Sequence, residues 1–399
     1  MPLSSDGINY IIGSEQTAGQ MPQLKAMRPF EPVTLDFLSA LSKILLKTGA
    51  DYPDVAAFGF WCRRASLEQM KKEAGDLSYR LGCGIVFHST PSNVPVNFAF
   101  SFAAGLLAGN GNIVRLPAKD FPQVQIICDG IKSLIAERYK ELEKYICFIK
   151  YTSQKKVTDY FSELCDVRMV WGGDMTVRKM EQSPLQPRAF EIDFADRHSI
   201  CIINAEYYLR LSEKEKRRTA ADFYNDTYLS DQNACTSPGL IVWTGEEKQQ
   251  AQKQFWNRLE EQVLERYDLA PVQAVGKLSA FCRLSAMKEG ITLKRHLNNA
   301  MWVIEVKNLS SDLMEYKYHS GFFLEYEASG VGELSPILNK KCQTVSCLGE
   351  DRKGLAEEIM SMGVRGADRI VPIGKTMDFS LIWDGYDLLR ILSRKIDVF

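Results

Sequence analysis

The sequence predicts an α/β fold with parallel, helix-covered sheets, and two observations carry that prediction. Short apolar strand candidates alternate with helical stretches between residues 84 and 171, and the alternation starts again past residue 200. Hydrophobic residues make up 45% of the 399 residues, which suffices for more than one well-buried core. Strands and helices that alternate at this spacing are typical of parallel sheets of the nucleotide-binding kind.

The first predicted elements are a helix, a strand, a second helix and a second strand. Residues 33–47 carry apolar side chains at helical spacing and predict an amphipathic helix. The apolar residues of 84–88 predict a strand, which runs into a turn rich in Ser, Thr and Pro and then into an apolar helix over 96–108. The sequence GNG at 109–111 is a turn signal, and a second strand over 112–116 follows it.

The later elements follow by the same reasoning. Predicted helices lie at 122–139, 154–164, 211–228 and 246–267, and predicted strands lie at 146–149, 167–171, 201–203 and 240–243. We therefore expect a nucleotide-binding domain over residues 1–199, including an N-terminal helical segment. A second α/β domain over 200–372 is expected to be the catalytic domain, and 373–399 form a C-terminal segment.

Composition excludes several classes of protein. The formal net charge is −1 and no basic stripe interleaved with aromatic residues is present, so no nucleic-acid partner is expected. The amino terminus has no signal-peptide pattern, and the longest apolar stretch, 94–108, falls short of the roughly 20 residues of a membrane helix. The ten cysteines form no CxxC pair and no zinc-type cluster with histidine, so we expect a cytoplasmic chain with reduced thiols and no metal site.

One of the ten cysteines, Cys235, has unusual neighbours. Residues 230–239 read SDQNACTSPG, which surrounds this thiol with small and polar residues ahead of an apolar strand. Most single cysteines are small buried hydrophobes, whereas a thiol at a loop-to-strand junction is accessible, as nucleophilic catalysis requires. Cys235 is therefore a candidate nucleophile, with a buried structural thiol as the alternative.

Asn93 lies in the turn HSTPSNVP, where a predicted strand leads into a helix. This is the edge at which parallel α/β sheets bind ligands. An asparagine amide at that edge can donate a hydrogen bond to a developing oxyanion, or it can simply cap the helix that follows.

Two other segments also follow strand ends. Gly172 and Gly173 allow a backbone to approach a pyrophosphate at a helix N-terminus, although such pairs are often ordinary turns. Arg115 and Lys119 are cations beyond another strand, where the ordinary role is a solvated strand end.

The order of these motifs resembles that of a known superfamily. PSNVP, AGNGNIVRLP, WGG, the acidic residues 191–193 and DQNACTSP occur in the order found in aldehyde dehydrogenases. Within that superfamily the chain resembles the LuxC-type acyl-CoA reductases, the fatty acid reductases of bacterial bioluminescence systems, and residues 369–396 are also typical of that branch. The resemblance covers about residues 80–396 and implies an aldehyde dehydrogenase-like fold, with a Rossmann-type nucleotide-binding domain and an α/β catalytic domain.

The resemblance also implies roles for single residues. Cys235 takes the place of the nucleophile, and the Asn93 amide, together with the backbone N–H of Cys235, takes the place of the oxyanion hole. Arg115 stands where aldehyde dehydrogenases use a lysine against the adenosine ribose. Gly172 and Gly173 stand in the turn before the helix that faces the pyrophosphate.

The cofactor implied by the resemblance is NADPH. NAD-selective relatives often carry a glutamate three positions after the ribose-binding lysine, where this chain has Ala118, followed by Lys119. The loss of a carboxylate and the gain of a cation would accommodate a 2′-phosphate.

Two family motifs are missing from the sequence. The Glu-Leu-Gly-Gly motif that supplies a hydrolytic general base has only Asp193 and its neighbours as a partial match, and residues 343–345 occupy the region of the ribose-binding Glu-x-Phe-Gly-Pro motif. A weaker hydrolytic base suits a reductase, because water would otherwise consume the acyl-enzyme. His88 is close to Asn93 in the sequence, and a structural role is expected for it.

The resemblance therefore implies an enzyme that reduces an acyl-CoA or acyl-protein thioester to an aldehyde, through a thioester and a thiohemiacetal on Cys235. Three alternatives stay open: an aldehyde dehydrogenase for a small aldehyde, a cysteine-dependent acyltransferase or thioesterase, and a non-catalytic subunit of an acyl-reducing complex. An acyl-protein ligase is a candidate partner, and a homo-oligomer is expected.

Overall fold

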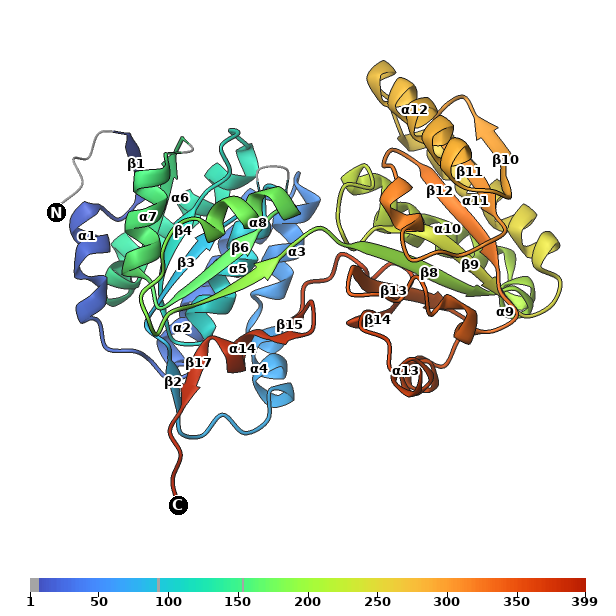
Figure 1. Ribbon diagram of the computed structural model, residues 1–399. Helices are drawn as coiled ribbons and strands as arrows, with labels where there is room; N and C mark the ends of the chain where they lie inside the picture. Colours follow the sequence, from blue (N-terminus) through green and yellow to red (C-terminus); the bar gives the residue numbers. More distant parts are fainter. Residues whose placement is uncertain (1–6, 92–93, 153) are drawn as a thin grey trace. The chain divides into compact units, whose positions relative to one another are not determined.

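Residues 7–91, 94–152 and 154–399 are described by the computed structural model, which forms two compact units (Figure 1). The first unit comprises Met1–Ala195 and Phe379–Phe399, and the second comprises Asp196–Asp378. The chain passes between the units at residues 195–196 and again at 378–379, whereas the sequence analysis expected boundaries at 199 and 372. Of the expected C-terminal segment 373–399, residues 379–399 belong to the first unit.

A six-stranded sheet in the order β1-β5-β4-β3-β6-β7 forms the centre of the first unit. Its strands are β1 (Ile8–Ile12), β3 (Ile85–Ser89), β4 (Gly111–Arg115), β5 (Ile146–Tyr151), β6 (Val167–Trp171) and β7 (Phe190–Phe194). All neighbouring pairs are parallel except β1 and β5. The chain builds outward from β3 to β5, then crosses to β6 and β7, so the strand order reverses between β3 and β6. Open α/β sheets bind ligands at such a reversal, outside the carboxyl ends of the strands.

The helices of the first unit begin where the sequence favours a helix start. Proline occupies the first helical position of α2, α3 and α6, where its missing N–H costs no hydrogen bond. The helices are α1 (Glu15–Gln20), α2 (Pro32–Thr48), α3 (Pro53–Trp61), α4 (Arg64–Glu73), α5 (Asn97–Leu107), α6 (Pro122–Glu137), α7 (Lys155–Leu164), α8 (Asp174–Glu181) and α14 (Leu388–Ile391), with 3-10 turns η1 (Met21–Gln23) and η2 (Lys140–Tyr145). The predicted strands and helices of 84–171 are present, with small differences at their ends.

Helices cover both faces of this sheet. Successive side chains of a strand point to opposite faces, so neighbouring residues of one strand pack against different helices. Val86 of β3 packs in one core with apolar residues of α2, α5 and α6. Phe87, the next residue, packs in a second core with residues of α7 and α8. Both are fully buried, so β3 lies at the centre of the unit.

The C-terminal segment completes the first unit. Strand β17 (Ser393–Lys395) pairs antiparallel with β2 (Arg80–Gly82), and β15 (Ile382–Trp383) forms a short hairpin with β16 (Tyr386–Asp387). Phe379 packs against the rings of Trp61 and Phe100, with centroids 5.9 and 4.9 Å away. The Trp61 indole N–H also donates a hydrogen bond to the Phe379 carbonyl oxygen over 3.1 Å.

A seven-stranded sheet in the order β10-β11-β12-β9-β8-β13-β14 forms the second unit. Its strands are β8 (His198–Asn204), β9 (Pro238–Thr244), β10 (Ile291–Leu297), β11 (Met301–Val306), β12 (Phe322–Glu327), β13 (Cys342–Leu348) and β14 (Arg369–Pro372). Only β10 is antiparallel to its neighbour. The amino-terminal ends of β8, β9 and β13 therefore lie side by side at the same end of these parallel strands.

Helices cover both faces of this sheet as well. They are α9 (Ala205–Arg210), α10 (Glu213–Thr227), α11 (Lys248–Arg266), α12 (Pro271–Met287) and α13 (Arg352–Ser361), with 3-10 turns η3 (Tyr228–Ser230), η4 (Leu313–Tyr316) and η5 (Val331–Leu334). Residues of α9, α10 and α11 share one core with alternate residues of β8 and β9, and α12 and α13 contribute to the core of the other face.

Candidate active site

Cys235 lies in the loop between η3 and β9, at the amino-terminal edge of the second unit's sheet. Its side chain is half-buried. Asp231 and Gln232, at the start of this loop, have φ angles of 50° and 58°, and L-residues rarely adopt such left-handed conformations. Two such residues in succession persist only when the surrounding structure fixes them.

The buried Gln232 side chain fixes the loop through both ends of its amide. Its Oε1 accepts hydrogen bonds from the backbone N–H groups of Gly321 (3.0 Å) and Phe322 (3.1 Å). Its Nε2 donates to the carbonyl oxygens of Pro238 (3.1 Å) and Phe322 (3.2 Å). Gln232 therefore ties the loop to the start of both β9 and β12.

The Asp231 carboxylate makes a second set of contacts. It accepts hydrogen bonds from the hydroxyl groups of Tyr267 (2.5 Å) and Ser320 (2.9 Å) and from the Gln273 amide (2.6 Å). Hydrogen bonds from the side chains of His319, Tyr267 and Ser320 lower the pKa of this carboxyl group, although partial burial opposes them. The carboxylate stays ionised and anchors the loop to Tyr267 at the end of α11, to α12, and to Ser320, two residues before β12.

Asp226 joins the loop to the segment that precedes Phe379. Its carboxylate accepts hydrogen bonds from the backbone N–H groups of Gly374 (2.6 Å) and Thr376 (3.1 Å), and its carbonyl oxygen accepts one from the Ser237 hydroxyl (2.7 Å). Burial raises the pKa of Asp226 to about 6, even though these N–H donors favour the charged form.

The raised pKa of Asp226 predicts a specific pH dependence of stability. Its folded-state pKa lies above its unfolded value of 3.8, so its stabilising contribution is complete below pH 3.8 and is lost as the pH rises through about 6. Between pH 5 and 7.5 the wild type should lose ~1 kcal/mol of unfolding free energy that Asp226→Asn does not lose. Urea unfolding of both proteins across this range measures the difference, and parallel pH profiles would contradict the prediction.

Two consecutive residues of β13 hold Cys235 itself. The Gln343 Nε2 donates a hydrogen bond to the Cys235 Sγ over 3.3 Å. The Thr344 backbone N–H donates to the Ser199 Oγ (3.2 Å), and that hydroxyl donates to the Cys235 carbonyl oxygen (2.7 Å). These hydrogen bonds hold both the sulfur and the backbone of Cys235 at the amino-terminal ends of β8 and β13.

The other cysteines differ from Cys235. Cys282 is exposed on α12. Burial raises the pKa of the remaining thiols and makes them poor nucleophiles: Cys62, Cys83, Cys128, Cys147, Cys165, Cys201, Cys342 and Cys347. Cys235 combines partial exposure with a loop fixed from several sides.

A cavity of about 640 Å³ lies in the first unit, beyond the carboxyl ends of β4, β5 and β6. Among the described residues, its lining includes no carboxylate and four cationic side chains: Arg115, Lys155, Arg178 and Lys179. The Arg115 guanidinium lies over the Tyr151 ring, 4.4 Å from its centroid, which orients it at the end of β4. The position and the charge both suit a phosphate-bearing ligand.

The turn before α8 borders this cavity. A Cβ on Gly172 would lie 2.9 Å from the Thr176 Cβ, so the turn requires glycine there. Gly173 is the N-cap residue of α8, and no side chain caps this helix. Met175 and Thr176 in the first turn of α8 line the cavity, so the backbone amides of that turn lie beside it.

The expected site residues lie as follows. Arg115 lines the cavity, and Gly172 and Gly173 precede the helix that forms one wall. Lys119 is exposed and is not among the lining residues, whereas Lys155, Arg178 and Lys179 are, although the sequence analysis did not single them out. Asn93 lies outside the described residues.

His88 and Asp193 are not among the residues that line this cavity. His88 is fully buried in the first unit, with Nδ1 2.7 Å from the Ser101 Oγ and Nε2 3.1 Å from the Asn112 Oδ1. Burial lowers its pKa to about 4, so it is a neutral structural group at pH 7. Asp193 is exposed on β7, and its neighbour Glu191 is ion-paired with Arg168.

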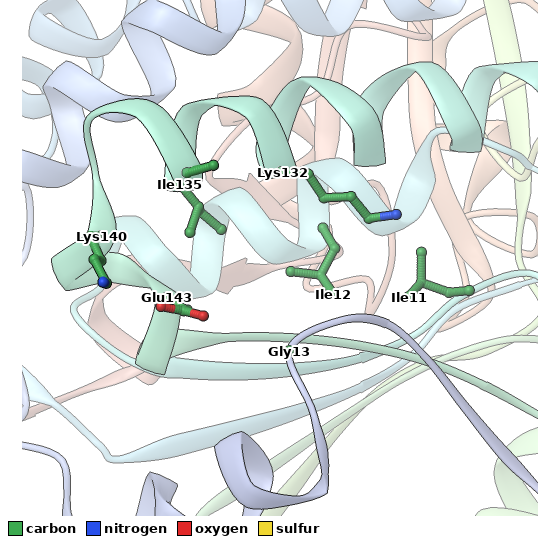
Figure 2. A pocket seen from close by; sticks show the side chains of 8 residues that line it. Ile11, Ile12, Gly13, Lys132, Ile135, Lys140 and Glu143 are labelled. Carbon is green, nitrogen blue, oxygen red and sulfur yellow. The ribbon is translucent and has the colours of Figure 1, made fainter.

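Figure 2 shows a second hollow of the first unit, of about 400 Å³. It is formed by Ile11, Ile12 and Gly13 at the end of β1, by Lys132 and Ile135 of α6, and by Lys140 and Glu143 of η2. A Cβ on Gly13 would lie 3.1 Å from the carbonyl oxygen of Ile146, the first residue of β5. The hollow therefore lies at the amino ends of the strands, away from the edge where α/β sheets bind ligands.

The described part of the chain contains neither a metal-binding cluster nor a helix that could span a membrane. Residues 7–91, 94–152 and 154–399 contain no group of three His, Cys, Asp or Glu side chains placed to hold a metal ion. Over the same residues, no helix has the length and apolar character needed to cross a membrane.

Solved structures of aldehyde dehydrogenases have the same fold. The NAD-dependent benzaldehyde dehydrogenase from Corynebacterium glutamicum is 11% identical, with a TM-score of 0.65 over 98% of this chain and 94% of that one. The methylmalonate-semialdehyde dehydrogenase from Oceanimonas doudoroffii is 10% identical, with a TM-score of 0.63 over 96% and 91%. An oxidoreductase from Marinobacter aquaeolei is 11% identical, with a TM-score of 0.63 over 91% and 82%. The predicted aldehyde dehydrogenase-like α/β fold is confirmed.

The sequence itself matches a family over nearly its whole length. No curated protein matches the chain at a significant level. The family described as acyl-CoA reductase (LuxC) matches residues 24–395. This chain therefore belongs to the LuxC acyl-CoA reductase family and is an aldehyde-forming oxidoreductase.

Proposed function

We propose that this enzyme reduces an acyl thioester, carried by coenzyme A or by a protein, to an aldehyde with NADPH, and that Cys235 is its nucleophile. The observation that carries the proposal is the half-buried Cys235 thiol on its fixed loop, with the Gln343 amide 3.3 Å from the sulfur. A nucleophile has to be both accessible and held in one position, and the buried cysteines lack the first property.

The chain's own groups would act in sequence. The Cys235 thiolate attacks the thioester carbonyl, a new C–S bond forms, and the carrier leaves as a thiolate that takes up a proton. The Cys235 backbone N–H and the Asn93 amide would donate hydrogen bonds to the oxyanion of this step. NADPH, when bound, supplies the hydride that reduces the acyl-enzyme. Hydride addition leaves a thiohemiacetal alkoxide on Cys235. Its C=O bond re-forms as the C–S bond breaks, the electron pair of that bond returns to the sulfur, and the aldehyde leaves.

The cationic cavity beside α8 supports a phosphate-rich cofactor. Its position at the strand-order reversal is the one at which open α/β sheets bind dinucleotides. Arg115, Lys155, Arg178 and Lys179 supply positive charge on three sides, from β4, α7 and α8. NADPH carries one phosphate more than NADH, so a lining with four cations and no carboxylate favours it. The benzaldehyde dehydrogenase of the same fold uses NAD, which supports a nicotinamide cofactor here.

Incubation with NADPH and acyl-CoAs of graded chain length tests the proposal. One aldehyde should form for each NADPH oxidised, and the KM for NADH should exceed that for NADPH. Release of free coenzyme A and fatty acid without NADPH oxidation would contradict the proposal and indicate a thioesterase.

Charge reversal in the cavity extends this test to the cofactor site. Arg178→Glu places a carboxylate among the lining cations and should raise the KM for NADPH at least about tenfold, or ~1.4 kcal/mol. Lys132→Glu is the matched control, because it reverses a charge in the second hollow (Figure 2), which lies at the amino ends of the strands. Equal effects of the two changes on the KM for NADPH would argue against cofactor binding beside α8.

A further inference from the structure

We propose that Gln343 is a catalytic residue whose side-chain amide stabilises the thiolate of Cys235. The proposal rests on the role of Cys235 as the nucleophile. It adds a group on β13 that lies in the region where the family's ribose-binding motif is missing from this sequence.

The contact itself is direct. The Gln343 Nε2 lies 3.3 Å from the Cys235 Sγ, within hydrogen-bonding distance for a sulfur acceptor. Gln343 is fully buried, so its amide loses more by leaving this contact than an exposed side chain would. The Thr344 hydroxyl lies 3.5 Å from the Gln343 Oε1 and donates to it, which directs the NH₂ end of the amide towards the sulfur.

The same strand also fixes the backbone of Cys235. Thr344, the next residue of β13, donates its N–H to the Ser199 hydroxyl, which donates in turn to the Cys235 carbonyl oxygen. All three partners, Gln343, Thr344 and Ser199, are buried. With its backbone held, the sulfur keeps its position relative to the Gln343 amide, and the hydrogen bond needs no rearrangement when the thiolate forms.

An amide donor distinguishes the two protonation states of sulfur. A thiol is a weak acceptor, whereas a thiolate accepts strongly, so an N–H donor favours the charged form. The amide is neutral and does not titrate, so its effect persists at every pH at which the protein is folded. The thiolate leaves the acyl-carrying carbon once in each cycle, when the thiohemiacetal collapses, and the same donor would stabilise the sulfur as it regains its electron pair.

The test measures the thiolate without any substrate. The rate at which iodoacetamide alkylates Cys235 is followed against pH in the full-length wild type and in Gln343→Met, which keeps the side-chain length but lacks the donor. Peptide-resolved mass spectrometry separates Cys235 from the exposed Cys282, which serves as the internal reference. The alkylation midpoint of Cys235 should rise by about one to two pH units in the variant, while that of Cys282 should not move.

A second variant distinguishes the loss of the amide donor from a folding defect as the cause of a shifted midpoint. Gln343→Glu has the same shape but places a carboxylate beside the sulfur, so the midpoint should rise further than in Gln343→Met. Equal Cys235 midpoints in the wild type and in either folded variant would overturn the proposal. A raised KM for NADPH with an unchanged midpoint would also overturn it and would indicate a cofactor-binding role instead.

Failure of this inference and failure of the proposed function are distinguishable. A shifted midpoint in an enzyme that makes no aldehyde would support the Gln343 contact and reject the reductase mechanism. Aldehyde formation that requires Cys235 but is indifferent to Gln343, with unchanged midpoints, would support the mechanism and reject the contact as catalytic.

Discussion

Cys235→Ala should abolish acyl labelling of the protein and lower NADPH-dependent aldehyde formation by at least about three orders of magnitude. The expected loss is large because the variant has no group that can form the covalent intermediate, and the surrounding hydrogen bonds cannot replace a nucleophile. Intact-protein mass spectrometry after exposure to an acyl-CoA, together with NADPH absorbance, measures both steps.

Cys282→Ala is the matched control, because it removes the exposed thiol of α12 and should leave both readouts unchanged. Acylation that survives in Cys235→Ala, at whatever cysteine, would remove Cys235 from the mechanism. Cys235→Ser should resemble the alanine variant in aldehyde formation, since a serine hydroxyl is far less ionised than a thiol at neutral pH.

Gln232→Leu should cost about 3–5 kcal/mol of unfolding free energy in the second unit and lower aldehyde formation at least tenfold. The change leaves the N–H groups of Gly321 and Phe322 and the carbonyl oxygens of Pro238 and Phe322 without their amide partner. Each buried group left without a hydrogen bond costs roughly 1–3 kcal/mol. Chemical denaturation followed by tryptophan fluorescence measures the stability, and activity is measured well below the unfolding transition.

The neighbouring side chain provides the control for Gln232. Asn233 is exposed, and its side chain donates to the carbonyl oxygens of Ser230 and Asp231 and to the Asp231 carboxylate, all within three residues of it. Asn233→Ala should therefore change the unfolding free energy by about 0.5 kcal/mol or less. Similar losses in the two variants would mean that Gln232 is no more important than any other polar residue of the loop.

The sequence predicted the strands that contain an apolar run and the helices whose apolar residues recur at helical spacing. Strands β3 to β6 each contain a short apolar run of two to four residues, because parallel strands covered on both faces bury nearly every side chain. Strand β13 was not predicted, because Gln343, Thr344 and Ser346 are polar yet fully buried. Only the tertiary structure shows that these side chains have partners, so local propensity could not identify this strand.

The candidate site, too, was only partly predictable from the sequence. The polar neighbours of Cys235 distinguish it in the sequence from the other thiols, but the sequence did not show that Asp231 and Gln232 hold the loop. Several of their partners, at residues 320–322, lie about 90 residues further along the chain. The cations Lys155 and Arg178 look like solvated helix residues until the fold brings α7 and α8 to one cavity. Lys119, chosen for its position in the sequence, does not line it.

The return of the C-terminal segment to the first unit imposes an order on biosynthesis. Asp196–Asp378 is one uninterrupted stretch, so the second unit can fold as soon as it has emerged from the ribosome. The first unit has to wait, because β2 has no partner strand until residues 393–395 are made, and the ring of Trp61 lacks Phe379 until then. During translation the first unit therefore lacks the partner strand of β2 and the Phe379 contact of Trp61 until residues 379–395 have been made.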